Sequence, residues 1–275
     1  MTITDYKSFK LLGEGVQAQV FRAKHAETHQ VVAIKVLDDY PSFERERSIL
    51  GKIAELQLKN SIKLLDSFII GSLYYLVIDY VNSDELHKYV LDRLYVQTPE
   101  SQLKAVFVKI LLAVRELHQS NICHLDLKLE NILYHHKAGE VKLIDFGFAE
   151  PTVEEKPDGK VADRLLEKFC GSIHYSAPEI INNQPYDGKK VDVWALGVLL
   201  YVLAAREFPF PGESHGHDEI NPTTVYRQIL RGHVHWPHYF SANLVDLIDI
   251  MLQHSPSKRP SIDALLQHPW LKFTK

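Results

Sequence analysis

Two clusters of polar residues lie on either side of a short apolar stretch, and their spacing limits the folds open to this chain. The first cluster is His124-Leu125-Asp126-Leu127-Lys128-Leu129-Glu130-Asn131, and the second, Asp145-Phe146-Gly147, begins fourteen positions after Asn131. The interval fits a hairpin of two short strands, which would place the clusters on neighbouring loops. Two carboxylates, an ammonium and an amide would then face one small volume. Such groups can hold a hydroxyl against a magnesium-bound triphosphate.

The first eighty residues favour β-strands, and the residues after Asp84 favour helices. β-Branched and aromatic runs predict strands over residues 9–13, 20–23, 31–37, 62–70 and 74–80, interrupted by a helix with Ser42 as its N-cap. Thr98 is the expected N-cap of a second helix, with Pro99 at its first position. Apolar residues predict a buried helix over 191–205, followed by helices over 244–252 and 262–266. A small sheet lobe beside a larger helical lobe leaves a cleft, the usual place for a ligand.

Composition places the chain among ordinary globular proteins. It has 275 residues, 45% of them apolar and 24% charged, and its net charge of −4 does not favour a nucleic-acid or anionic-membrane partner. Cys123 and Cys170 cannot build a disulfide framework and suit a reducing compartment. The first residues lack the features of a signal peptide, and the longest apolar run, residues 193–205, is too short to span a bilayer. We expect an intracellular protein, cytoplasmic or nuclear, with no nucleic-acid or membrane partner.

The two polar clusters resemble the catalytic core of the eukaryotic protein kinases. Other matching phrases are Cys170-Gly171-Ser172, Ala177-Pro178-Glu179, Asp192-Val193-Trp194-Ala195-Leu196-Gly197-Val198 and His268-Pro269-Trp270-Leu271. Together they look like the calmodulin-dependent and Snf1-like branch of the serine/threonine kinases, and the likeness covers residues 6–271. It implies an α+β, two-lobed fold in one domain, residues 1–275. The N-lobe (about 6–81) would hold an antiparallel sheet and one main helix, the hinge would be about 79–84, and the larger C-lobe (about 85–271) would be mainly helical.

The resemblance implies a phosphate-binding surface in the N-lobe. Gly13 and Gly15 would let the backbone approach phosphate oxygens, although a plain β-turn is the alternative. Lys35 ends the matching phrase Val32-Ala33-Ile34-Lys35 and would bind the α- and β-phosphates of ATP. Glu46, only eleven residues later, is the predicted partner of Lys35, and Glu44 is the competing choice.

By the same resemblance, residues 75–81 form the strand and hinge against which adenine lies. Ile78 would be the gatekeeper, and the backbones of Asp79 and Val81 would hydrogen-bond the purine edge. The side chains expected to sandwich the purine are Leu12, Val20, Ala33 and Leu133. Glu85, just after the hinge, is assigned to both the nucleotide site and the protein-substrate site.

The resemblance also gives roles to the two polar clusters. Asp126 would accept or orient the proton of the incoming hydroxyl, and Lys128 would neutralise charge on the transferring phosphoryl group. Asn131 and Asp145 would ligate magnesium through oxygen. The position of Lys128 resembles the serine/threonine kinases rather than the tyrosine kinases.

Several further residues match positions that support the family's fold. His124 is expected to pack beneath Phe146 rather than to titrate in the reaction. Glu179 and Arg259 would form a buried ion pair, and Asp192 would brace the backbone of the catalytic loop.

Three residues bear on the protein substrate. Ser172 matches the threonine that touches the catalytic aspartate and helps to select a serine or threonine acceptor. Glu85 and Glu130 match acidic positions that contact basic residues upstream of the acceptor. We therefore expect a protein substrate with Arg or Lys before its Ser/Thr, although both acids could be simple solvated side chains.

Two departures from the family pattern concern regulation. Leu125 stands where the family commonly has an arginine that binds a phosphate on the activation segment, which here would be residues 145–179. Lys168 stands at the usual phosphothreonine position. The phosphate-binding arginine and the threonine that would carry the phosphate are both missing, so we expect activity without phosphorylation at that position. Residues 152–168, which include Thr152 and the charged stretch 154–160, are expected to form a mobile insert without an assigned role.

The resemblance implies direct in-line transfer of the γ-phosphoryl group of Mg-ATP to a Ser/Thr hydroxyl. A pseudokinase scaffold is the alternative, favoured by Leu125, by the short run to Glu46 and by Ala18 in place of the family's third glycine. A small-molecule kinase is disfavoured because the segment from Ser172 to Glu179 suits a protein platform. Five scattered histidines fit a surface better than a metal site: His215, His217, His233, His235 and His238.

Overall fold

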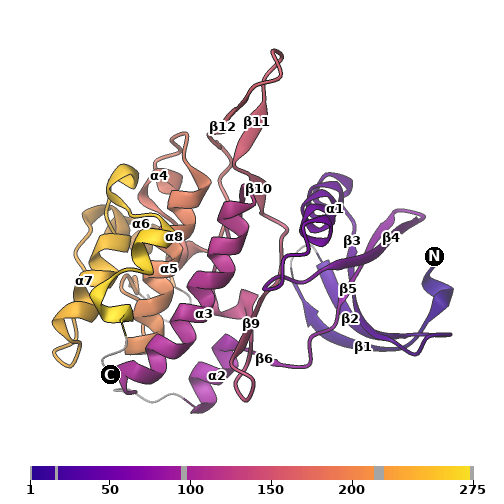
Figure 1. The fold of residues 1–275 in the computed structure, drawn as a ribbon, viewed down its shortest axis with the longest axis horizontal. Helices are drawn as coiled ribbons and strands as arrows, with labels where there is room; N and C mark the ends of the chain where they lie inside the picture. Colours follow the sequence, from indigo (N-terminus) through magenta and orange to yellow (C-terminus); the bar gives the residue numbers. More distant parts are fainter. Residues whose placement is uncertain (1, 16–17, 94–97, 214–219, 273–275) are drawn as a thin grey trace.

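The computed structural model describes residues 2–15, 18–93, 98–213 and 220–272. Its N-terminal part contains a five-stranded antiparallel sheet in the order β1-β2-β3-β5-β4, and helices form most of the rest (Figure 1). The strands are β1 (Tyr6–Glu14), β2 (Ala18–His25), β3 (Val31–Leu37), β4 (Leu64–Ile70) and β5 (Leu73–Asp79). Each of the five predicted strands is present, and the α+β, two-lobed fold is confirmed.

Helix α1 (Tyr40–Glu55) lies between β3 and β4 and starts earlier than predicted. Ser42 is not its N-cap, because the Asp39 carboxylate accepts the backbone N–H of Ser42 at 2.8 Å and caps the helix instead. Pro41 fits the first turn, where a backbone N–H has no partner within the helix. The early start places Glu46 roughly two turns into the helix, which compensates for the short connection from Lys35.

The larger lobe is built on helices around one apolar core. Its helices are α2 (Leu86–Arg93), α3 (Glu100–Gln119), α4 (Pro178–Ile181), α5 (Gly188–Ala205), α6 (Pro222–Arg231), α7 (Ala242–Met251) and α8 (Ile262–Leu265). The predicted central helix, α5, is buried along nearly its whole length. Thr98 is not the N-cap of α3: Pro99 keeps an extended backbone, with ψ of 132°, and is itself the residue before the helix.

Short strands and 3₁₀ turns connect these helices. The strands are β6 (Asp84–Glu85), β7 (Ile122–Cys123), β8 (Ile132–His135), β9 (Glu140–Leu143), β10 (Glu150–Pro151), β11 (Val153–Glu155) and β12 (Val161–Asp163). The 3₁₀ turns are η1 (Ile3–Asp5), η2 (Leu129–Asn131), η3 (Ile173–Tyr175), η4 (Pro256–Lys258) and η5 (Pro269–Leu271). Strands β8 and β9 form the hairpin predicted between the two polar clusters.

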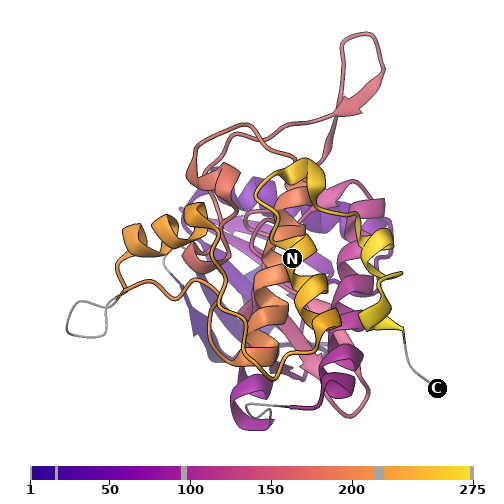
Figure 2. The same cartoon turned by 90° about the vertical axis from the view of Figure 1, so that its left-hand side faces the viewer.

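The insert over residues 152–168, which was expected to be mobile, contains a hairpin of two strands. Strands β11 and β12 pair antiparallel within it, from Val153 opposite Asp163 to Glu155 opposite Val161. Both views show this hairpin extending away from the rest of the molecule (Figures 1 and 2). Among the described residues, no helix combines the length and the apolar character needed to cross a membrane.

Candidate active site

Strand β3, helix α1 and the second polar cluster bring three charged side chains together. Lys35 Nζ lies 2.8 Å from Glu46 Oε2 and 2.8 Å from Asp145 Oδ1. Lys35 and Glu46 are buried, whereas the Asp145 side chain is 45% exposed and so can face a ligand. The competing acid, Glu44, pairs with Arg47 on the outer surface of α1. The structure thus places Glu46, and not Glu44, beside Lys35.

The charges of this trio depend on one another. Burial alone would lower the pKa of Lys35, but the negative charges of Glu46 and Asp145 outweigh it and raise that pKa. Burial raises the pKa of Glu46, and Lys35 works against that rise. Burial would also raise the pKa of Asp145, yet Lys35 outweighs it and the Asp145 pKa is lowered. Lys35 therefore remains a cation and Asp145 a carboxylate at neutral pH.

The first polar cluster holds Asp126 in a closed set of hydrogen bonds. Ser172 Oγ donates to Asp126 Oδ1 at 2.9 Å, and Asn131 Nδ2 donates to Asp126 Oδ2 at 2.9 Å. Lys128 Nζ lies 2.8 Å from Asp126 Oδ2 and donates to Ser172 Oγ at 2.8 Å. A carboxylate fixed by these donors is oriented before any hydroxyl arrives, as a group that handles its proton must be.

Asp192 of α5 supports the backbone that leads into this cluster. Its fully buried carboxylate accepts the backbone N–H of His124 at 2.9 Å and of Leu125 at 2.8 Å, and it contacts His118 Nε2 at 2.8 Å. Leu125 has a positive φ of 65°, an unfavourable conformation that these bonds help to hold. The His124 ring lies 5.0 Å from the Phe146 ring, centroid to centroid, as expected for a packing role.

The oxygens near Asp126 suit a hard cation shared with phosphate. Asn131 uses its Nδ2 for bonds to Asp126 O and Oδ2, which leaves its amide oxygen for a cation. Asp145 gives Oδ1 to Lys35, so Oδ2 is its remaining carboxylate oxygen. Magnesium takes one or two side-chain oxygens and completes its shell with water and phosphate. The donors present therefore fit magnesium bound together with a nucleotide.

No group of three or more His, Cys, Asp or Glu side chains suited to a metal occurs within the described part of the chain. Of the five scattered histidines, His215 and His217 lie outside the described residues, and His233, His235 and His238 form no such group.

The predicted adenine surface lies along β3 and β5. Ala33 and Ile78 are cross-strand partners and are both buried. The Asp79 N–H donates to Lys63 O at 3.1 Å. The other predicted contacts are partly or largely exposed: Leu12, Val20, Val81 and Leu133.

Open space lies beside Gly13, near the end of β1, and beside Gly15, directly after that strand. The N–H of Gly15 donates to Ala18 O at 2.8 Å. A Cβ built on Gly13 would meet no atom within 4 Å, and one on Gly15 would meet Ala18 O at 3.8 Å. Phosphate oxygens could approach the backbone here even with alanine at position 18.

The predicted substrate acids lie at the surface. Glu85 is exposed on β6, opposite Leu133 of β8, and Glu130 is exposed on η2 between Lys128 and Asn131. Elsewhere in the larger lobe, Arg259 makes a two-pronged ion pair with Glu179, at 2.6 and 2.8 Å, with both side chains buried. Such a pair is costly to break because either partner alone would be an unpaired buried charge.

Sequence reasoning missed an ionic network next to the Lys35 trio. Arg45 Nε lies 3.5 Å from Glu150 Oε1, and Arg164 Nη1 lies 3.0 Å from Glu150 Oε2. Arg45 also donates to the carbonyl of Gly147 at 3.4 Å. The partners are far apart in sequence and follow no periodic pattern. The available signal was the position of Arg45, directly before Glu46.

Comparison with known proteins gives one consistent result. The family model described as "Protein kinase domain" matches residues 6–271. Serine/threonine-protein kinase kin-29 of Caenorhabditis elegans is 34% identical over 97% of this chain and 31% of its own length. Mitosis inducer protein kinase cdr1 of Schizosaccharomyces pombe is 35% identical over 98% of this chain and 42% of its own length. CBL-interacting protein kinase 5 of Oryza sativa subsp. japonica is 33% identical over 97% of this chain and 56% of its own length. The chain thus spans about a third to just over half of these curated relatives.

Proposed function

The chain belongs to the protein kinase domain family, and from that premise we propose that it transfers the γ-phosphoryl group of Mg-ATP to a serine or threonine hydroxyl of a protein. The observation that carries the proposal is the hydrogen-bonded set of Asp126, Lys128, Asn131 and Ser172, with the Lys35–Glu46–Asp145 trio beside it. The whole arrangement suits a reaction in which positioning and charge supply most of the acceleration.

Each residue has a defined task in this proposal. Lys35, held by Glu46, contacts the α- and β-phosphates, and the Asn131 and Asp145 oxygens hold magnesium. When bound, magnesium supplies charge neutralisation on the triphosphate. Asp126 orients the acceptor hydroxyl and takes its proton, while Lys128 neutralises charge that develops on the transferring group. Transfer is in line, without a covalent enzyme intermediate.

Two finer features complete the proposal. Exposed Glu85 and Glu130 favour substrates with Arg or Lys before the acceptor. Activity does not require phosphorylation at the usual site, because Leu125 is buried and uncharged and Lys168 cannot accept a phosphate ester there.

A radiolabel assay tests the proposed activity. Label from γ-³²P-ATP is expected to pass to a generic basic protein substrate, and Asp126→Asn is expected to slow transfer about 100-fold or more. Calorimetry with ATP shows whether the variant still binds nucleotide. Equal background labelling by both proteins would favour the pseudokinase scaffold. The short connection to Glu46 no longer supports that scaffold, since the ion pair with Lys35 forms.

A further inference from the structure

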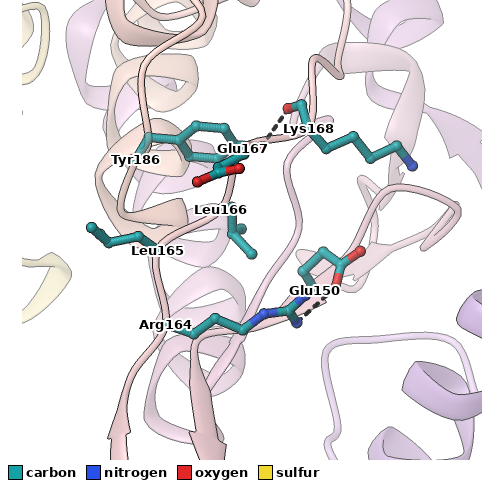
Figure 3. Close-up of a pocket in the computed structure, with 7 residues that line it drawn as sticks. All are labelled: Glu150, Arg164, Leu165, Leu166, Glu167, Lys168 and Tyr186. Carbon is teal, nitrogen blue, oxygen red and sulfur yellow. Dashed lines mark hydrogen bonds and ion pairs between the residues drawn. The ribbon is translucent and has the colours of Figure 1, made fainter.

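Glu150 lies between two cations that come from different parts of the chain. Its carboxylate reaches Arg45 of α1 through one oxygen and Arg164, just after β12, through the other. The side chains of Glu150, Arg45 and Arg164 are 16%, 27% and 36% exposed, so water screens the contacts only in part. Figure 3 shows the Glu150–Arg164 pair in the wall of a pocket of about 250 Å³ that contains none of the predicted nucleotide residues.

The backbone of Glu150 is fixed next to the catalytic loop. Strand β10 pairs with β7, with Glu150 opposite Cys123, and Cys123 Sγ donates to the Glu150 carbonyl at 3.2 Å. Strand β7 leads directly into His124 and on to Asp126. Glu150 therefore belongs to the two-stranded β7–β10 sheet, whose other strand leads into the first polar cluster.

On one side, Glu150 contacts α1 through Arg45. Arg45 precedes Glu46, the buried partner of Lys35, and its second contact, to the Gly147 carbonyl, lies on the same segment as Glu150. A helix held at Arg45 cannot rotate or shift outward without breaking both contacts. Since Glu46 reaches Lys35 only from this helix position, the Arg45–Glu150 pair favours the assembled trio.

On the other side, Glu150 contacts the segment that follows the β11–β12 hairpin, through Arg164. The Arg164 N–H donates to Thr152 O at 2.9 Å, and Leu166 and Tyr186 exchange backbone hydrogen bonds of 2.9 Å. The Tyr186 hydroxyl donates to Lys168 O at 2.8 Å, which Figure 3 marks together with the Arg164 contact. The segment is thus tied to the larger lobe at successive points from Glu150 to Lys168.

We infer that Glu150 is a positioning residue, a built-in anion that links α1 to the activation segment and keeps the Lys35–Glu46 pair assembled. The inference rests on the proposed function, because the placement of Glu46 serves phosphoryl transfer. With a fixed carboxylate at this junction, and uncharged Leu125 two residues after Cys123, the strand partner of Glu150, the link needs no added phosphate.

The test compares Glu150→Gln with a matched control, Glu44→Gln. Glu44 is also an acid in an ion pair with an arginine, but that pair stays within α1 and is exposed. Glu150→Gln is expected to lower kcat about 5- to 10-fold while KM values change less than about twofold. Hydrogen exchange of α1 amides should become faster, and that of α5 should not change. The control should match the unmodified protein in every measurement.

Hydrogen exchange separates the failure of this inference from the failure of the proposed activity. If the unmodified protein transfers no phosphate, faster exchange confined to α1 in Glu150→Gln still supports the link. Unchanged α1 exchange overturns the inference, whether or not the protein is active. Equal acceleration in α1 and α5 also overturns it, because the residue would then stabilise the whole fold rather than position one helix.

Discussion

At the scale of single residues, the site depends on groups that keep their charge because of their neighbours. Lys35 is buried, and two carboxylates hold its pKa above the ordinary value. The pKa of Asp145 is instead lowered in the folded protein. The ionised Asp145 therefore stabilises the fold fully at pH values above the ordinary aspartate pKa. That stabilisation is lost as the pH falls through the lower pKa of the folded state. Leu125 and Asp145 both have positive φ, at 65° and 61°, so unfavourable backbone conformations occur at both polar clusters.

Replacement of one exposed acid tests the proposed substrate preference. Glu130→Gln is expected to lower kcat/KM about 3- to 5-fold for peptides with Arg or Lys upstream of the acceptor, because one exposed charge pair is lost. Peptides without upstream basic residues should be affected far less. A peptide array read by phosphate incorporation gives both values.

Glu140→Gln is the matched control for that array. Glu140 is an exposed acid in β9, at the turn end of the hairpin and away from η2. If Glu130→Gln and Glu140→Gln leave the same preference as the unmodified protein, Glu130 is a solvated surface acid and the proposed contact is wrong.

At the scale of elements, the activation segment is held by contacts that are already present. Leu166 and Tyr186 join it to the larger lobe through paired backbone bonds, and the segment's β11–β12 hairpin is an ordered pair of strands. Gly171 lies so close to the catalytic loop that an added Cβ would fall 2.9 Å from Leu125 O, and its φ of 88° suits glycine. These contacts join the segment to the larger lobe and bring Gly171 against Leu125.

Phosphatase treatment tests this property of the activation segment. The treated protein is expected to keep its kcat within about twofold, because the contacts that order the segment involve no phosphate. Mass spectrometry of residues 145–179 before and after treatment serves as the control for phosphate content. Loss of activity together with loss of a phosphate from this segment would show that the segment is regulated after all.

At the scale of the whole molecule, patterns of side chains predicted the lobes better than the details of their connections. Strand β3 was predictable from its largely apolar, β-branched run, and the hairpin was predictable from the short interval between the two clusters. The N-cap Asp39 was missed because Ser42 is an equally good capping residue, and only the folded backbone shows that Asp39 accepts the Ser42 N–H. Helix α2 was not predicted, because it has only eight residues and its buried pair, Leu86 and Val90, is too short a pattern to indicate a helix.

Long-range charge pairs were the least predictable feature of the candidate site. Glu46 could be chosen from its phrase, and its contact with Lys35 follows once α1 begins at Tyr40. The contacts of Glu150 with Arg45 and Arg164 depend on how three separate segments meet. The sequence gives no local signal for these ion pairs, because Arg and Glu are common on protein surfaces and their positions alone do not show which of them will pair.

We propose that Lys35, Asn131 and Asp145 together form one site for ATP and magnesium. Calorimetric titration of ATP with and without Mg²⁺ tests it most directly, with Asp145→Asn as the variant and Asp163→Asn, exposed on the β11–β12 hairpin, as the control. Mg²⁺ is expected to tighten ATP binding about tenfold in the unmodified and control proteins, and Asp145→Asn should lose that gain. ATP binding that ignores Mg²⁺ in the unmodified protein, or an unchanged gain in Asp145→Asn, would contradict the claim.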